Sequence, residues 1–271
     1  MFAKLRSLIR FIRRYSTLDR EIDDRIHTLT GLMRIDETLP EDIFVVGYPK
    51  SGNTWMQNLL AGVVYGLDPE CMPDDLVDHL VPDVHYRRYY RRFGTPMHFK
   101  SHYLPRPGYR RVIYLLRDGR DVMVSFFHHL RTFHDDNKID FGDMVRTGRN
   151  LYPGKWHEHV NAWQSNPYNA EVMILKYEDL LAAPVKQLVR TCQFLAITRS
   201  ISLIESVIEK SSFARMRAKE ERFAQGNPAR RKDKFLVRRG IVGSYKDEMP
   251  KQLLDLFLTD AGETLRASDY L

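Results

Sequence analysis

The stretch around residue 50 constrains this chain most. Ile43–Gly47 is a short apolar run rich in β-branched residues, which predicts a buried parallel strand. After a short turn, apolar side chains recur with helical spacing over Trp55–Val64. A strand that turns directly into a helix aims backbone N–H groups and the positive end of the helix dipole at one small space, which favours an anion. Lys50 adds an ammonium group and Thr54 a hydroxyl, so we interpret Tyr48–Trp55, hereafter the phosphate loop, as a phosphate-binding element.

The phosphate loop departs from the pattern of nucleoside-triphosphate enzymes. That pattern is a glycine, four residues, and then Gly-Lys-Ser/Thr. Gly47 and Gly52 have the right separation, but Asn53-Thr54 follow, and the lysine has moved forward to Lys50. The usual Mg²⁺ ligand and γ-phosphate lysine are therefore missing from their places. An ordinary connection with a solvated lysine is the alternative, and the strand–turn–helix context favours phosphate binding.

Composition narrows the classes of protein. The chain has 271 residues, 43% of them hydrophobic and 28% charged, with no linker-like stretch or repeat, which predicts one globular domain over 1–271. The net charge of +7 favours polyanionic ligands. Only Cys71 and Cys192 occur, and neither has a second ligand-type residue at the spacing of a metal site. We therefore expect a reducing, cytoplasmic compartment, with neither a disulfide framework nor a metal site.

Residues 1–40 read as a charged, helical N-terminal extension. Within Met1–Arg14 the apolar residues fall on one helical face, and the basic residues interrupt any apolar core that a secretory signal would need. Such a helix can lie peripherally on an anionic membrane surface or dock on its own domain. We favour docking. For Ser16–Pro40 we expect surface helices and loop before the first strand.

Two more strand–turn–helix units follow. Arg111–Leu116 predicts a buried strand that ends in the polar run Arg117–Asp121, where Asp121 is placed to cap the next helix. Glu171–Leu175 predicts a third strand, followed by Lys176–Leu180. Strands that alternate with helices indicate an α/β fold of the P-loop type, a central parallel sheet with helices on both sides. Ligands then bind at the carboxyl ends of the strands, where the polar clusters lie.

Two basic segments have competing interpretations. The run Tyr86–Arg92 interleaves tyrosine with arginine, which suits stacking on bases or holding an anionic acceptor, but we favour a solvated helix face with packed rings. Arg230–Gly240 is a basic loop that ends in an arginine pair before a glycine. Beside a phosphate loop, that pair is a candidate second phosphate clamp, because guanidinium groups match phosphate oxygens in pairs.

Six segments in this order resemble the cytosolic-type sulfotransferases, which use 3′-phosphoadenosine 5′-phosphosulfate (PAPS). The resemblance spans residues 43–246, and a single motif would be much weaker than six in sequence. The matching segments are the phosphate loop, Lys100-Ser101-His102, the spaced set Arg117, Asp121 and Ser125, Tyr177–Leu180, Ser211-Ser212-Phe213, and Arg238–Lys246.

The resemblance implies a role for each matching residue in holding the donor nucleotide. The 5′-phosphate would be held by Ser51, Gly52, Asn53 and Thr54. The 3′-phosphate would be held by Arg117, Ser125, Arg238, Arg239 and Gly240. The adenine would lie against Trp55, Tyr177, Ser212 and Phe213.

It also implies the catalytic groups. His102 would be the general base that takes the proton of an acceptor hydroxyl, and Lys100 would support the sulfonate. Lys50 would contact the bridging oxygen and neutralise the leaving phosphate, so no metal is required. His98, on the same predicted strand face, is the rival base, and we prefer His102 because it lies at the carboxyl end of the strand.

Several residues depart from the family pattern. Asn53 and Ser101 stand where threonine is usual, Arg239 replaces lysine, and Tyr245 replaces tryptophan. Pro250-Lys251 occupy the Thr-Val positions of the usual dimerisation pattern, so the standard dimer is not expected and the oligomeric state stays open.

The leading hypothesis is transfer of the PAPS sulfonate to a hydroxyl, or less favourably an amine, of a small-molecule or glycan acceptor. The acceptor pocket would come from the weakly periodic segments 67–96, 134–155 and 218–237. A P-loop nucleotide kinase is one alternative, and the displaced lysine argues against it. The other is a non-catalytic basic module that binds nucleic acid, which would leave His102 and the phosphate loop without a role; we expect no nucleic-acid partner.

Overall fold

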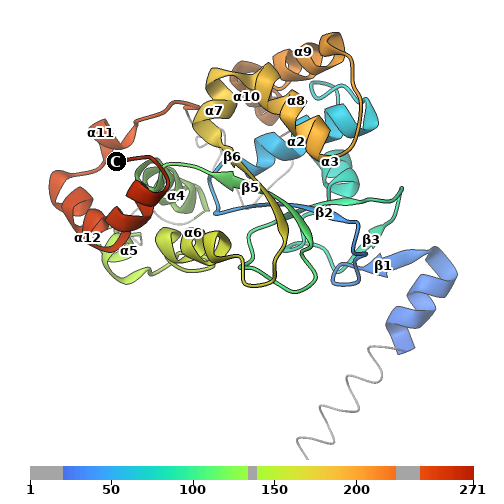
Figure 1. Ribbon diagram of the computed structural model, residues 1–271, viewed down its shortest axis with the longest axis horizontal. Helices are drawn as coiled ribbons and strands as arrows, with labels where there is room; N and C mark the ends of the chain where they lie inside the picture. Colours follow the sequence, from blue (N-terminus) through green and yellow to red (C-terminus); the bar gives the residue numbers. More distant parts are fainter. Residues whose placement is uncertain (1–20, 134–138, 224–238) are drawn as a thin grey trace, which may run out of the picture.

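The computed structural model describes residues 21–133, 139–223 and 239–271 (Figure 1). The predicted amphipathic helix Met1–Arg14 and the predicted phosphate ligand Arg238 lie outside the described residues. The same holds for most of the Arg230–Gly240 loop, of which only Arg239 and Gly240 are described.

A four-stranded parallel sheet forms the centre of the fold (Figure 1), as predicted. Its register places Phe44 beside both Phe99 and Val112, and Gly47 beside Leu115, so the strands end close together. In the order β4-β2-β5-β6, the strands are His98–Ser101, Ile43–Gly47, Arg111–Leu116 and Glu171–Lys176. Parallel strands need crossover connections, and those from β2 to β4 and from β5 to β6 contain helices.

Side chains alternate between the two faces of this sheet, and each face builds its own core. Phe44 and Val46 belong to one core and Ile43 and Val45 to the other, which explains why the whole of β2 is buried. The first core is completed by α4 (Gly119–Phe133), α5 (Phe141–Thr147), α6 (Trp156–Ser165) and α12 (Lys251–Ala267). The second is completed by α2 (Asn53–Tyr65), α3 (Asp74–Leu80), α7 (Tyr177–Ala182), α8 (Pro184–Phe194) and α9 (Ile201–Lys210).

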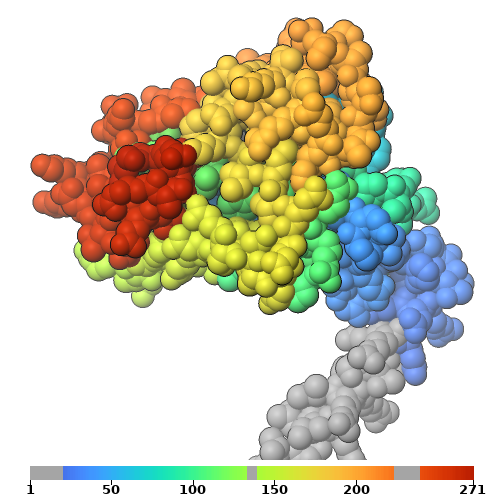
Figure 2. Space-filling view, in the orientation of Figure 1, coloured from blue at the N-terminus to red at the C-terminus, as the bar shows by residue number. Residues whose placement is uncertain are grey.

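The C-terminal helix closes the first core. In Figure 2 the red α12 lies against the yellow-green segment that contains α6. Thr264 donates a hydrogen bond to the Asn161 side chain (2.8 Å), and the Gln164 amide donates to Ser268 (3.1 Å). The remaining helices are α10 (Phe213–Phe223) and the short α11 (Tyr245–Glu248). Across the described ranges, no helix has the length and apolar character needed to cross a membrane.

A small antiparallel pair corrects two expectations. The Ser16–Pro40 segment was predicted as helix and loop, but it contains β1 (Leu32–Arg34). The Tyr86–Arg92 run was predicted as a helix face, but Tyr89–Arg91 is strand β3, paired with β1. Alternation explains the difference, because a strand can bury the Tyr90 ring against Phe99 while its neighbours point outward.

Ion pairs neutralise most arginines of that run. Arg92 binds the buried carboxylate of Asp42 with two nitrogens, at 2.9 and 2.6 Å. Arg87 pairs with Asp78, and Arg88 pairs with Asp23 at 3.3 Å. A guanidinium group whose charge is neutralised by a carboxylate contributes little to phosphate binding. The geometry therefore does not favour a nucleic-acid-binding surface here.

Buried histidines make the fold sensitive to acid. His98 is 4% exposed, and its two ring nitrogens have no hydrogen-bond partner in the described part of the chain. Burial lowers the pKa of His98 to about 4 from 6.5. As the pH falls, His98 is protonated in the unfolded chain at a higher pH than in the folded protein. Protonation of His98 therefore lowers the free energy of unfolding between pH 6.5 and about 4.

We predict that His98→Leu makes the protein less acid-sensitive. Integrating the linkage for a pKa of about 4 against 6.5, the pH-dependent loss should shrink by about 2 kcal/mol between pH 7.5 and pH 5. Urea unfolding at the two pH values measures this difference. The same substitution at the exposed His27 is the control, and an equal acid loss in His98→Leu and the native protein would contradict the prediction.

Candidate active site

The phosphate loop has a backbone conformation that its sequence explains in part. Gly52 has φ 96°, in the left-handed region, and an added Cβ would lie 2.8 Å from the Tyr177 ring. Lys50 also has positive φ, 74°, which is uncommon for a non-glycine residue and must be held by its surroundings. The turn closes where the Ser51 N–H (3.1 Å) and the Asn53 side-chain amide (3.0 Å) both donate to the Tyr48 carbonyl.

Buried polar atoms that lack partners gather around this loop. Buried polar atoms in folded proteins almost always have a hydrogen-bond partner. Within the described residues, four such atoms around the amino end of α2 have none, and together with that helix end they fit a polar, anionic ligand. They are Ser51 Oγ, Asn53 Oδ1, Trp55 Nε1 and Arg117 Nε.

Arg117 joins the phosphate loop to two other segments. Its Nη1 donates to the Lys50 carbonyl at 3.0 Å, and its Nη2 donates to the Ile241 carbonyl at 3.3 Å. Its guanidinium lies 4.3 Å from the centre of the Tyr177 ring, in cation–π contact. Trp55 meets the same ring edge-on at 5.8 Å, so the predicted adenine-site residues Trp55 and Tyr177 are neighbours.

The predicted 3′-phosphate and adenine segments also meet. Gly240 has φ 64° and lies directly against the Phe213 ring, which leaves no room for a Cβ. Arg239 is exposed and pairs with Glu248 at 2.9 Å. Ser125 is partly buried on α4, Ser212 is partly buried before α10, and Thr54 is exposed on the first turn of α2. Within the described residues, no hydrogen bond or ion pair joins Ser125 or Ser212 to the phosphate loop.

Asp121 has a different role from the predicted helix cap. Its two buried carboxylate oxygens accept hydrogen bonds from the Gly243 N–H (2.7 Å), the Ser244 hydroxyl (3.1 Å) and the Tyr245 N–H (3.0 Å). The helix-cap prediction is wrong because the loop after Gly240 brings three donors to this carboxylate. Asp121 thereby holds the loop that carries Arg239 and Gly240.

His102 lies directly after β4, beside the phosphate loop. Its Nδ1 is 2.7 Å from the Gly47 carbonyl, so Nδ1 carries the proton and Nε2 carries the lone pair. Burial, followed by the Lys100 charge, lowers the pKa of His102 far below 6.5. The ring is therefore neutral at neutral pH, with a lone pair on Nε2 that can accept a proton. The rival His98 lies in the core, as described above.

Lys100 has a partner that its sequence neighbours did not indicate. Its Nζ lies 2.9 Å from Asp83 Oδ2, and the two side chains are only 12% and 2% exposed. Burial alone would raise the pKa of Asp83, but Lys100 and the His85 backbone N–H outweigh burial and lower it. The pair is therefore ionic, a cation and an anion in a poorly hydrated place.

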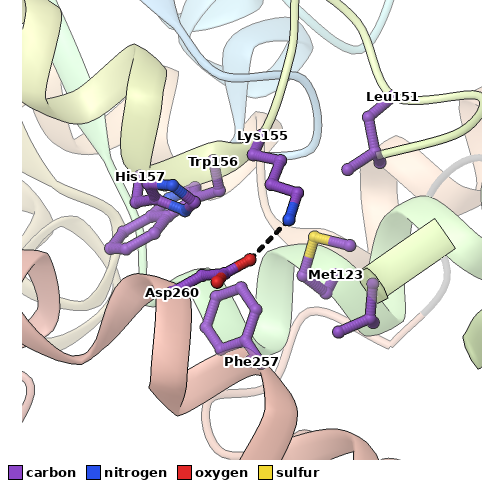
Figure 3. Close-up of a pocket in the computed structure, with 8 residues that line it drawn as sticks. Met123, Leu151, Lys155, Trp156, His157, Phe257 and Asp260 are labelled. Carbon is purple, nitrogen blue, oxygen red and sulfur yellow. Dashed lines mark hydrogen bonds and ion pairs between the residues drawn. The ribbon is translucent and has the colours of Figure 1, made fainter. Parts of the chain in front are cut away.

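A recess elsewhere on the molecule is separate from these residues. Figure 3 shows it between α4, α6 and α12, crossed by an ion pair between Lys155 and Asp260, with Trp156 and Phe257 beside it. None of its lining residues is a predicted site residue.

Comparison with known proteins decides the family. A model of the sulfotransferase domain family matches residues 40–268. The chain belongs to the sulfotransferase family. Sulfotransferase 1E1 of Mus musculus is 26% identical over 240 residues, which cover 80% of this chain and 81% of that protein. Sulfotransferase 4A1 of Rattus norvegicus is 29% identical over 184 residues, covering 63% and 65%.

Solved structures agree on the fold. Retinol dehydratase, solved with androsterone and the inactive cofactor PAP, superposes with a TM-score of 0.66 at 21% identity, over 84% of this chain and 82% of that one. Mouse sulfotransferase SULT7A1 with PAP gives 0.60 at 23% identity, over 86% of each chain. The family predicted from the sequence and the parallel α/β fold are both confirmed.

Two residues that contact the predicted catalytic groups of this sulfotransferase escaped sequence analysis. Asp83 and His85 come from the weakly periodic segment 67–96, and only their approach to Lys100 and His102 in space reveals them. A hydrophobic pattern carries no signal for such pairs.

We predict that Gly52→Ala damages the phosphate loop. The new methyl group would collide with the Tyr177 ring and would occupy a left-handed backbone position, so the protein should lose about 1–3 kcal/mol of stability. Binding of adenosine 3′,5′-bisphosphate (PAP), measured by calorimetry, should weaken as well. Gly108→Ala is the control, because nothing lies within 4 Å of its Cβ position. Native-like binding by Gly52→Ala would contradict this prediction.

Proposed function

We propose that this sulfotransferase moves the sulfonate of PAPS to a hydroxyl group of a small-molecule acceptor. The observation that carries the proposal is the position of His102, a neutral imidazole with a fixed tautomer that is hydrogen-bonded to the strand end where the phosphate loop begins. A base for the acceptor and a binding element for the donor are thus joined at Gly47.

The donor site is supported by residues at three strand ends. Ser51, Gly52, Asn53 and Thr54 would hold the 5′-phosphate with loop N–H groups and the amino end of α2. Arg117 has an Nε–H without a partner among the described residues, and Arg239 lies on the adjoining loop, so both suit the 3′-phosphate. Trp55, Tyr177 and Phe213 supply rings for the adenine. Related structures hold PAP, the product that remains after sulfonate transfer.

The acceptor proton goes to His102. As the acceptor oxygen attacks sulfur, the bond from sulfur to the 5′-phosphate oxygen breaks and the hydroxyl proton passes to Nε2. The Gly47 carbonyl holds Nδ1–H and stabilises the imidazolium that forms. General-base assistance of this kind contributes about 10²–10⁴-fold.

Two lysines would balance the anionic charge. Lys50, in the phosphate loop, suits the bridging oxygen, where negative charge grows as the phosphate leaves. Lys100 suits the sulfonate oxygens, and Asp83 keeps its ammonium group beside His102. That no metal takes part remains a prediction.

A small alcohol is the favoured class of acceptor. Retinol dehydratase has been solved with retinol and with androsterone, both of which carry a hydroxyl group. The family match gives no support to a nucleotide kinase or a nucleic-acid module. Cytoplasmic location, a single domain and the absence of the standard dimer stay predictions.

We predict that His102→Ala strongly slows transfer while PAP still binds. Loss of the base should lower kcat by about 10²–10⁴-fold with PAPS and a panel of simple alcohols and phenols, measured as released PAP. Calorimetry should show unchanged PAP affinity. His27→Ala, at an exposed histidine, is the matched control. Full activity in His102→Ala would remove the base assignment, and absence of PAP binding by the native protein would remove the proposed function.

Lys50→Ala should slow the chemical step. Removing a charge that meets the leaving group should cost about 10²–10³-fold in kcat, because this interaction strengthens in the transition state. Single-turnover release of PAP from PAPS measures this step directly. Lys251→Ala, at an exposed position, controls for loss of positive charge. An unchanged rate in Lys50→Ala would exclude Lys50 from the mechanism.

A further inference from the structure

Residues 82–85 run alongside the end of β4 and extend the sheet. The Lys100 N–H donates to the Pro82 carbonyl (2.9 Å), and the Val84 N–H donates to the Lys100 carbonyl (3.0 Å). These bonds form a parallel bridge in which Asp83 is the partner of Lys100. In such a ladder, partner side chains lie on the same side, and so do residues two apart. Asp83 and His85 are therefore in register with Lys100 and His102.

The side-chain contacts follow that register. Asp83 Oδ2 pairs with Lys100, and Asp83 Oδ1 accepts the His85 backbone N–H at 2.9 Å. His85 Nε2 accepts the His102 backbone N–H at 2.8 Å. The His85 and His102 rings stack with centres 5.3 Å apart and planes 23° apart. Lys100 is thus held by Asp83, and His102 by His85 in addition to the Gly47 carbonyl.

We propose that Asp83 and His85 are positioning residues of the transfer reaction, Asp83 orienting the Lys100 ammonium and His85 fixing the backbone and ring of His102. The proposal rests on the proposed function, because it assigns supports to the base and the lysine. Neither residue needs to touch the donor or acceptor. Backbone misplacement of about 1 Å can cost a reaction about 10²-fold, which is the scale of effect expected here.

His85 can do this only while it is neutral. Accepting the His102 N–H requires a lone pair on Nε2, so Nδ1 carries the proton and donates to the Tyr152 hydroxyl at 3.2 Å. A protonated ring has N–H groups at both positions and would repel the His102 amide. Protonation of His85 in acid should therefore break its hydrogen bond to the His102 N–H.

The charged surroundings of His85 agree with a neutral ring. Burial is the main cause that lowers its pKa below 6.5; Asp83 opposes this, while Lys100 and Arg106 reinforce it. The other titratable groups against it are His102, Tyr103 and Tyr152, whose rings contact it. Burial, followed by the Lys100 charge, lowers the pKa of His102 as well.

Two substitutions separate positioning from packing. His85→Phe keeps a stacked ring but has no acceptor for the His102 N–H. His85→Gln has an amide oxygen near the place of Nε2 and does not titrate. With PAPS and 4-nitrophenol as probe acceptor, His85→Phe should lose about 10–10²-fold in kcat with little change in the KM for PAPS. His85→Gln should recover most of that loss, and its kcat should fall only at lower pH than that of the native enzyme.

A ligand-free measurement makes the test independent of catalysis. Hydrogen exchange of the His102 amide, followed by NMR, should be slow in the native protein and in His85→Gln, and fast in His85→Phe. Asp83→Asn, which keeps an acceptor for the His85 N–H but loses the charge, should lower kcat without faster exchange of the His102 amide. Asp75→Asn, at an exposed carboxylate on α3, is its control.

The outcomes distinguish the two proposals. Equal kcat, pH profile and amide exchange in His85→Phe and His85→Gln would overturn the positioning role, whatever their common level. If His85→Phe folds poorly, the pH dependence of kcat and the His102 amide exchange in His85→Gln still test the proposal. If kcat of His85→Gln falls at the same pH as that of the native enzyme, the positioning role is overturned. If the native protein binds no PAP and releases none from PAPS, the proposed function fails, while amide exchange still reports whether His85 holds His102.

Discussion

The buried guanidinium of Arg117 is the contact on which the site depends. It hydrogen-bonds the Lys50 carbonyl, reaches the Ile241 carbonyl and stacks on the Tyr177 ring, so it joins the segments that follow β2, β5 and β6. Lys50 has a left-handed backbone, which an L-residue adopts only when its surroundings hold it there. The hydrogen bond from Arg117 helps to keep Lys50 in this conformation. The planar Arg117 guanidinium can donate to two carbonyls while its Nε–H stays available for a ligand.

The sheet explains why these segments meet. Four short parallel strands end at one side of the sheet, and Lys50, His102, Arg117 and Tyr177 follow those four ends. Gly47 links the two halves of the site there. Its backbone continues into the phosphate loop, while its carbonyl fixes His102. A Cβ at this position would collide with Asn53 and Leu115, so the close approach of β2, α2 and β5 depends on glycine.

The sequence was sufficient for the sheet, the helices on both sides and the family, because continuous apolar runs and loop motifs are local signals. It placed Lys50, Arg117, Tyr177 and His102 correctly at strand ends. It failed where the deciding contact is distant in the chain. The Tyr89–Arg91 strand depends on pairing with β1 and on ion pairs of its neighbouring arginines with Asp42 and Asp23. Asp121 does not cap its helix because it accepts hydrogen bonds from residues 243–245. Asp83 and His85 escaped for the same reason, since their partners lie 17 residues away.

One electrostatic field serves both halves of the proposed reaction. In the proposed reaction Lys50 and Lys100 would attract the anionic donor. After burial, the same charges help to lower the pKa of His129 on α4 to about 3. Burial and the Lys100 charge likewise lower the pKa of His102. Cations that draw in the bisphosphate therefore also keep the nearby imidazoles unprotonated, which a base requires. Asp83 limits this field by pairing with Lys100. Without that carboxylate, a buried ammonium would lie unpaired beside the base, and without the ammonium the carboxylate would draw a proton onto the ring. The pair thus lets a cation and a neutral base stand side by side.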